Sequence, residues 1–217
     1  MSRHKKRKFE ELKSMSNVVD AGISYSSKWN TAFFGNKLPT VLELGCGKGE
    51  YSIALARKFP DKNFIGIDIK GARLWRAGKD AMAAKLPNVA FLQIPIEKIE
   101  EYFSPNEISE IWIPFPDPYP RPCKAKKRLI SPKYLGFYKK VLVRNGIIHF
   151  KTDNEPLYDF ALDTINTEGH VILVQTNDLY HSEILDEFNS IPSMFEQIFI
   201  TQGKTIKYIQ FQLKEMG

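Results

Sequence analysis

The sequence predicts an α/β fold in which a mostly parallel, doubly wound sheet of about seven strands carries helices on both faces. Short apolar runs alternate with longer segments of helical periodicity along almost the whole chain. Strands that are separated by helices are joined by crossovers, which favours parallel pairing. The 217 residues suffice for one substantial core, and the chain shows no repeat and no linker rich in glycine or serine. We therefore expect a basic N-terminal extension over residues 1–30 and a single domain over residues 31–217.

Seven short apolar runs are the expected strands. In chain order they are Val41–Leu44, Asn63–Ile69, Val89–Gln93, Ile111–Phe115, Ile147–Phe150, Val171–Thr176 and Ile206–Leu213. The first run leads into glycines, and the second is entered through turn-forming residues, as expected at strand boundaries. The last two runs lie farther apart than the others, and a final antiparallel strand is compatible with that spacing.

Five segments with helical periodicity lie between these strands. They are Gly49–Lys58, Lys70–Lys85, Ile96–Phe103, Pro132–Val143 and Glu155–Thr167. Pro87 stops the second of them, since proline cannot continue a helix. Ser131 is the expected N-cap of the fourth, and Asn145 with Gly146 is its expected exit.

Positive charge is concentrated in two clusters, Arg3–Lys8 and Arg121–Arg128, in a chain with a formal net charge of +6. Such clusters attract phosphates and supply most of the non-specific affinity of proteins for nucleic acid. A solvated tail and a solvated loop would have the same composition, so the charge alone leaves both interpretations open.

Several classes of protein are disfavoured. No apolar run approaches the roughly 20 residues that cross a bilayer, and the N-terminus lacks the apolar stretch of a secretory signal. Cys46 and Cys123 show neither a metal-ligand spacing nor a disulfide framework. We therefore expect a cytoplasmic protein with no bound metal and no membrane partner.

The most informative segment is a glycine turn that follows the first strand. Gly45, Gly47 and Gly49 alternate with other residues directly after Val41–Leu44 and before a helix. Glycine lets the backbone turn tightly and approach a ligand, and a helix N-terminus offers free N–H groups. A dinucleotide dehydrogenase would show G-x-G-x-x-G around a pyrophosphate. This turn reads G-x-G-x-G and is preceded by the acid Glu43.

An acid beside the turn suits a cationic ligand and would repel a phosphate. S-adenosyl-L-methionine (SAM) has an ammonium and a sulfonium and no pyrophosphate, and Asp68 at the end of the second strand suits its ribose hydroxyls. The turn with Glu43 and Asp68 therefore resembles the SAM site of Rossmann-like class I methyltransferases. The alternative is a turn that only closes a strand–helix junction, with Cys46 as a small buried residue within it.

A proline-rich loop follows the fourth strand and holds Asp117 between prolines. In parallel sheets, ligands bind beyond the carboxyl ends of the strands. A carboxylate held rigidly there suits the N1–H and amino group of guanine, because it loses little entropy on binding. Tyr119 offers a stacking surface and Arg121–Arg128 offers cations for neighbouring phosphates. The alternative is a rigid structural loop with an incidental basic tail.

This loop resembles the F-P-D-P-W-x-K-x-R-x-x-K-R-R-L segment of bacterial tRNA (guanine-N7)-methyltransferases, and the resemblance extends over nearly the whole chain after the basic head. It implies that Glu43, Asp68 and Asp117 bind the cofactor and that Asp117 also lies against the base. The residues that it implies for substrate binding are Arg121 in place of a lysine, Asp153 in a T-D pair, and Ser193 and Glu196 in a T-x-F-E-like segment.

Three departures from the family pattern are visible. Tyr119 replaces a tryptophan and keeps an aromatic surface, and Ser193 replaces a threonine and keeps the hydroxyl. Pro95 and Ile96 stand where the family has Asp-Ala, so a carboxylate that reads the adenine amino group is missing. The backbone of Ile96 is expected to supply part of this contact.

The resulting hypothesis is a SAM-dependent tRNA (guanine-N7)-methyltransferase in which Asp117 orients the base and stabilises charge. The variable-loop position of the guanine is implied only by the resemblance. We expect tRNA as partner, no obligatory protein partner, and a monomer or homodimer. A small-molecule methyltransferase, a nicotinamide dehydrogenase and a tRNA-binding module without activity remain the alternatives. His149 lies within a predicted strand and is expected in the core rather than in catalysis.

Overall fold

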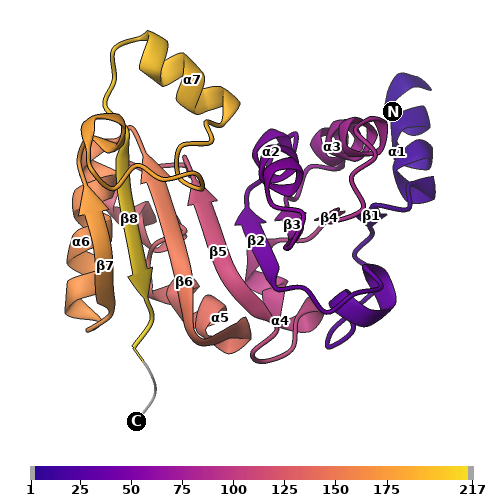
Figure 1. Cartoon of the computed structure of the whole chain (residues 1–217), viewed down its shortest axis with the longest axis horizontal. Helices are drawn as coiled ribbons and strands as arrows, with labels where there is room; N and C mark the ends of the chain where they lie inside the picture. Colours follow the sequence, from indigo (N-terminus) through magenta and orange to yellow (C-terminus); the bar gives the residue numbers. More distant parts are fainter. Residues whose placement is uncertain (1–2, 215–217) are drawn as a thin grey trace.

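The computed structural model describes residues 3–214, and its centre is an eight-stranded sheet with the order β1-β4-β3-β2-β5-β6-β8-β7 (Figure 1). The strands are β1 (Val18–Val19), β2 (Thr40–Leu44), β3 (Asn63–Ile67), β4 (Val89–Leu92), β5 (Ile108–Pro114), β6 (Leu142–Thr152), β7 (Val171–Thr176) and β8 (Lys207–Gln212). All neighbours from β1 to β6 pair in parallel, whereas β8 is antiparallel to both β6 and β7. The predicted fold class, mostly parallel with helices between the strands, is confirmed.

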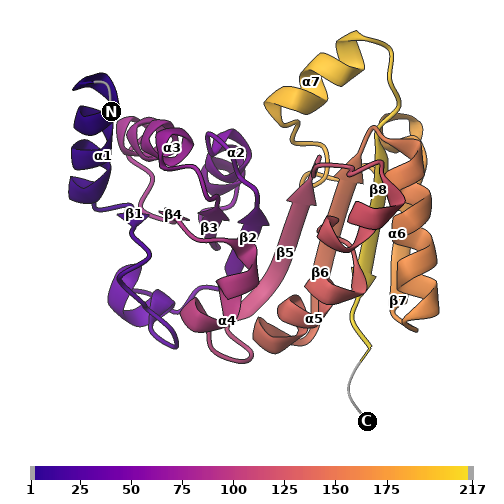
Figure 2. The ribbon, with the colours of Figure 1, turned by 180° about the vertical axis from the view of Figure 1, so that it is seen from behind.

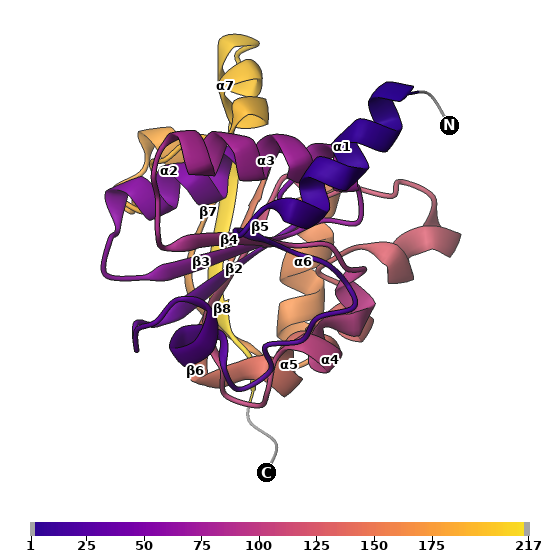
Figure 3. The same ribbon diagram turned by 90° about the vertical axis from the view of Figure 1, so that its right-hand side faces the viewer.

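Helices cover both faces of the sheet. They are α1 (Arg3–Ser14), η1 (Trp29–Phe33), α2 (Glu50–Lys58), α3 (Gly71–Ala83), η2 (Ile96–Lys98), α4 (Ile99–Tyr102), η3 (Pro122–Lys127), α5 (Pro132–Val141), α6 (Glu155–Thr167), η4 (Leu179–His181) and α7 (Met194–Thr201). The apolar residues of α1, α2 and α3 form one core with the sheet, and those of α4, α5 and α6 form a second core on the opposite face. Figures 2 and 3 show these two layers from behind and from the side.

The N-terminal segment is packed against the rest of the fold. Helix α1 lies along α3, and β1 adds a parallel strand beside β4. Trp29 is fully buried, and its Nε1 donates a hydrogen bond of 2.9 Å to the carbonyl of Tyr102. The packed fold therefore begins well before residue 31, the boundary expected from the basic composition of the head.

Three of the elements that differ from the sequence-based expectation show why the local pattern did not predict them. Strand β1 has only two residues, too few to produce a periodic pattern. Strand β6 starts at Leu142, directly after α5, so it is longer than the predicted run and includes Asn145 in a left-handed conformation (φ +57°). Helix α7 begins with a capping box between Ser193 and Glu196, a local signal that apolar periodicity does not detect.

Among residues 3–214, no helix has both the length and the apolar character that a membrane span requires.

Candidate active site at the carboxyl ends of four strands

Four neighbouring strands bring the expected site residues to one edge of the sheet. In the order β3-β2-β5-β6, Asp68 follows β3, the glycine turn follows β2, Asp117 follows β5 and Asp153 follows β6. The carboxyl ends of parallel strands point in the same direction, and ligands of such sheets bind there. The topology therefore gathers residues that lie up to 110 positions apart, from Glu43 to Asp153.

The glycine turn has two kinds of glycine. Gly45, Gly47 and Gly49 all have positive φ, +74°, +59° and +72°, a conformation that side chains disfavour. A Cβ at Gly45 or Gly47 would meet no atom within 4 Å, whereas one at Gly49 would lie 2.5 Å from the ring of Phe91. The first two glycines thus leave open space at the sheet edge, and the third allows α2 to pack closely.

Glu43 lies beneath this turn in the buried end of β2. Its Oε2 accepts a hydrogen bond of 2.9 Å from the backbone N–H of Ser52 and another from the Ser52 hydroxyl. Burial raises the pKa of Glu43 from about 4.5 to about 8, although both hydrogen bonds oppose that rise. A carboxylate that is costly to ionise in the free protein gains from a cation placed next to it.

Asp68 closes the turn from the neighbouring strand. Its Oδ2 accepts from the N–H of Gly47 at 3.1 Å, and its Oδ1 accepts from the N–H of Lys70 at 2.7 Å. Directly after it, Ile69 is 61% exposed, an unusual environment for a large apolar side chain. Sequence reasoning placed Ile69 inside the strand and missed it as a surface against which a ligand ring can pack.

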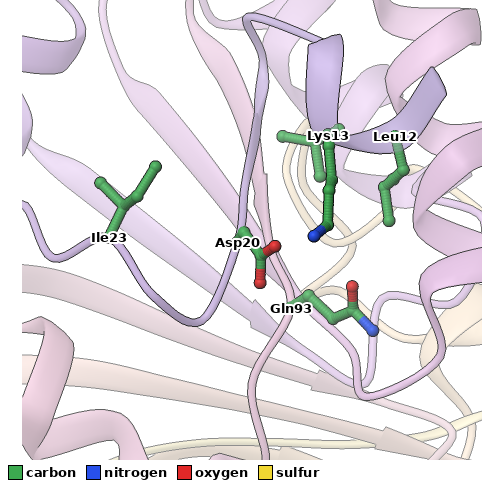
Figure 4. Close-up of a pocket in the computed structure, with 6 residues that line it drawn as sticks. Leu12, Lys13, Asp20, Ile23 and Gln93 are labelled. Carbon is green, nitrogen blue, oxygen red and sulfur yellow. The ribbon is translucent and has the colours of Figure 1, made fainter. Parts of the chain in front are cut away.

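Ile96 begins η2 beyond β4, and its side chain is partly buried. Next to this end of β4 is a cavity of about 240 Å³, shown in Figure 4. It is lined by Leu12, Lys13, Val18, Asp20, Ile23 and Gln93. Gln93 also donates from Nε2 to the carbonyl of Ile69 at 3.4 Å, which connects this cavity with the edge that carries Asp68.

This set of groups fits SAM by its chemistry. The acids Glu43 and Asp68, the open glycines of the turn and the exposed side chain of Ile69 lie together at this edge. The N–H groups of Gly45, Cys46, Gly47 and Gly49 are already hydrogen-bonded within the protein. Carboxylates accept hydrogen bonds from an ammonium and from ribose hydroxyls, and an apolar side chain suits a purine ring. Within residues 3–214, no group of three His, Cys, Asp or Glu side chains is placed to hold a metal ion.

Asp117 is exposed on a loop whose backbone is held from several sides. Phe115 and Tyr119 have positive φ, +50° and +41°, a strain that surrounding contacts must maintain. Arg128 supplies two of these contacts, from Nε to the carbonyl of Pro118 at 3.0 Å and from a terminal nitrogen to the carbonyl of Tyr119 at 3.2 Å. The loop is therefore braced by an arginine as well as by its prolines.

The basic cluster divides into two parts. Arg121 and the three lysines of η3 are exposed and available to phosphates; these η3 lysines are Lys124, Lys126 and Lys127. Arg128 is instead partly buried, with its guanidinium 4.3 Å from the ring of Phe160. One cation of the predicted phosphate-binding cluster is therefore used inside the protein.

Asp153 and Ser193 lie at the far side of this edge. Asp153 pairs with Lys204 at 2.6 Å and keeps 17% of its side chain exposed. The Ser193 hydroxyl accepts from the N–H of Glu196 at 3.1 Å and so caps α7. Both positions are partly accessible, but each polar group already has a partner in the protein.

Glu196 lies where a substrate cannot reach it in this conformation. It is fully buried, and its carboxylate accepts from Lys151, from the Tyr180 hydroxyl and from the N–H of Ser193. The direct substrate contact expected for Glu196 is thus not provided by this arrangement. Lys151 was missed by the sequence reasoning, because a lysine inside an apolar strand has no motif of its own.

His149 and Cys46 are both buried side chains. The His149 ring stacks on Trp112, with centroids 4.0 Å apart, and its Nδ1 lies 2.7 Å from the Tyr208 hydroxyl. Burial lowers the pKa of His149 and raises the pKa of the Cys46 thiol. A neutral imidazole and an un-ionised thiol in these positions belong to the core of the protein.

Known proteins resemble this chain at the level of sequence and of fold. Residues 37–209 match a family described as putative methyltransferase. The tRNA (guanine-N(7)-)-methyltransferase of Christiangramia forsetii is 46% identical over 98% of this chain and 99% of its own length. The protein of the same name from Bacteroides fragilis is 42% identical over 100% of this chain and 88% of its own length. The one from Brevibacillus brevis is 35% identical over 92% of this chain and 92% of its own length.

Solved structures share the fold at low identity. The 16S rRNA methyltransferase KamB aligns with a TM-score of 0.60 and 14% identity over 82% of this chain and 88% of its own. An antibiotic-related methyltransferase aligns with a TM-score of 0.63 and 18% identity over 91% of this chain and 96% of its own. The extent and identity of the sequence matches place this chain in the tRNA (guanine-N7)-methyltransferase family.

Proposed function

We propose that this chain transfers the methyl group of SAM to N7 of a guanine in tRNA, and that the guanine is the one in the variable loop. The observation that carries the proposal is the position of Asp117. It is exposed on a braced loop after β5, the strand next to the glycine turn of β2. A carboxylate at that place can face a cofactor and a base together. The name shared by the relatives supplies the guanine and the tRNA.

The cofactor would be held by the groups described above. Glu43, Gly45, Gly47 and Gly49 suit its amino-acid end, and Asp68 suits its ribose. Ile96 and the exposed Ile69 suit its adenine, with the backbone of Ile96 in place of the usual carboxylate contact. Bound SAM supplies an electrophilic methyl group on a sulfonium.

The proposed reaction requires little acid–base chemistry from the protein side chains. Guanine N7 carries a lone pair and no proton, so its methylation needs no general base. Asp117 accepts hydrogen bonds from the base and stabilises the positive charge that develops on the purine ring. Proximity and orientation alone supply roughly 7–11 kcal/mol in favourable cases, which makes the rigidity of the Asp117 loop part of the catalysis.

Binding of tRNA would involve both the loop and the far side of the edge. Arg121 and the η3 lysines meet phosphates, while Asp153 and Ser193 flank the flipped or exposed nucleotide. Glu196 contributes to substrate binding indirectly, through its buried hydrogen bonds with Lys151, the Tyr180 hydroxyl and the N–H of Ser193. The proposal includes a cytoplasmic enzyme that acts as a monomer or homodimer without an obligatory protein partner.

The test is transfer of labelled methyl from SAM to unmodified bulk tRNA, with the product nucleosides identified by mass. We expect labelled 7-methylguanosine from the unchanged protein. We expect Asp117→Ala to lose transfer about a hundredfold or more, as when a transition-state hydrogen-bonding group is removed, while the fold is kept and SAM still binds. Asp163→Ala, an exposed acid on α6, is the matched control.

Near-normal transfer by Asp117→Ala would remove Asp117 from the mechanism. SAM binding without any methylated nucleoside would favour the small-molecule methyltransferase. Methylation of tRNA at another atom would keep the substrate and refute the N7 assignment.

A further inference from the structure

Lys151 is a fully buried lysine near the carboxyl end of β6. Its Nζ donates to the carbonyl of Asn189 at 2.5 Å and to that of Ile191 at 3.3 Å. It also donates to both carboxylate oxygens of Glu196, at 2.9 and 3.2 Å. One ammonium thus holds three points of the chain between β7 and β8.

Glu196 completes this cluster from the first turn of α7. Besides Lys151, the Tyr180 hydroxyl donates to its Oε1 at 2.9 Å, and the N–H of Ser193 donates to its Oε2 at 3.0 Å. A buried ion pair offsets the cost of removing two charges from water only when further hydrogen bonds satisfy both partners. Here both partners are so satisfied, and the bonds are directed at particular backbone atoms.

The same lysine adjoins the residues assigned to catalysis. Its carbonyl accepts from the N–H of Phe115 at 2.9 Å, where the Asp117 loop begins. Asp153 follows it by two residues on the same strand end. Figure 1 shows α7 above this end of β5 and β6. Lys151 therefore stands where the Asp117 loop, Asp153 and the segment that ends in α7 meet.

We infer that Lys151 is a positioning residue for the tRNA substrate: through Glu196 and the two carbonyls it sets the place of α7 and Ser193 relative to Asp117 and Asp153. The inference rests on the proposed function. It also gives Glu196 an indirect role, through Lys151, in place of a direct contact with the nucleotide.

Stability alone does not account for such a cluster. Replacing a buried ion pair by apolar groups of similar size is often neutral or stabilising. An apolar side chain at position 151 would fill the space but would hold neither the carbonyl of Asn189 nor that of Ile191. What the lysine adds is a fixed position of the segment, and a misplacement of about 1 Å can cost a hundredfold in rate.

The experiment compares two variants of the full-length chain. Lys151→Met keeps the volume but leaves the Glu196 carboxylate buried without its cation. The double variant Lys151→Met/Glu196→Gln removes both charges, and glutamine can still serve in the capping box. The control is Ile165→Ala, a fully buried α6 residue in the core on the opposite face of the sheet, which is expected to lose about 2–5 kcal/mol of stability.

Four quantities are measured below the unfolding temperature of every variant: SAM affinity, kcat for tRNA, KM for tRNA, and hydrogen exchange of residues 185–201. For the double variant we expect a SAM Kd within about twofold of the unchanged protein. We expect kcat/KM for tRNA to fall about tenfold or more, with faster exchange in residues 185–201. Ile165→Ala should change stability while keeping the kinetics and that exchange.

Unchanged kcat/KM for tRNA in the folded double variant would overturn the inference and leave Lys151 as a packing residue. Unchanged exchange in residues 185–201 would overturn it as well. If Lys151→Met alone does not fold, the double variant decides. If the unchanged protein produces no 7-methylguanosine in tRNA, the proposed function is refuted instead. The exchange measurement would still test whether Lys151 fixes the position of residues 185–201.

Discussion

Replacing Glu43 with glutamine tests whether the buried acid of the proposed SAM site lowers the stability of the folded protein. In the folded protein burial raises the pKa of Glu43 from about 4.5 to about 8. In the unfolded chain the carboxyl ionises near its ordinary pKa. Between these two values unfolding releases a proton, so the contribution of Glu43 to stability falls as the pH rises from about 4.5 to about 8. Below this window both states are protonated, and above it both are ionised.

The size of the effect follows from the same two values. A pKa difference is worth about 1.4 kcal/mol per unit, so the rise from 4.5 to about 8 corresponds to at most about 5 kcal/mol. Glutamine keeps the shape and can still accept a hydrogen bond from Ser52, but it does not ionise. The Glu43→Gln protein should therefore gain stability relative to the unchanged protein by several kcal/mol between pH 5 and pH 9.

Urea unfolding of both proteins without cofactor, at pH 5, 7 and 9, measures this difference directly. His149 and His170 also titrate with lowered pKa values, but they occur in both proteins and cancel in the comparison. SAM affinity at pH 7.5 should fall about tenfold or more in the variant, since a hydrogen bond to a charged group contributes about 1.5–3 kcal/mol. A stability difference that is the same at pH 5 and pH 9 would refute the reasoning.

Four further variants probe the turn, the basic cluster and the braced loop. Gly49→Ala should lower stability by about 1–3 kcal/mol in thermal unfolding, because its Cβ would lie 2.5 Å from the ring of Phe91; Gly47→Ala should weaken SAM binding more and stability less. Changing all three η3 lysines to glutamine should reduce the salt dependence of tRNA binding by a slope of about 2–3, and an unchanged slope would remove them from the interface. Arg128→Met should lower kcat for tRNA and expose residues 116–121 to proteolysis while SAM affinity is kept; wild-type protease resistance would show that the prolines suffice.

Local patterns determined much of the fold in advance. The strands of the parallel part are short apolar runs between helices, and burial on both faces produces such runs. The glycine turn could also be predicted, because glycine adopts positive φ readily and leaves the space at Gly45 and Gly47 free of a side chain. Strand β1 could not be predicted from the sequence, since a two-residue strand is defined only by its pairing with β4.

The sequence by itself determined the doubly wound class, the turn between β2 and α2, and the acids Glu43, Asp68 and Asp117 at strand ends. These features depend on spacing and residue type within a few positions of one another. Only the tertiary structure decided that Arg128 braces the Asp117 loop, that Ile69 is exposed, and that Glu196 is buried against Lys151. The Lys151–Glu196 contact joins residues 45 positions apart, and the shorter-range contacts of Arg128 depend on how the loop folds back on itself. The residue type of a charged side chain does not reveal whether its partner is a phosphate, a carbonyl or another buried charge.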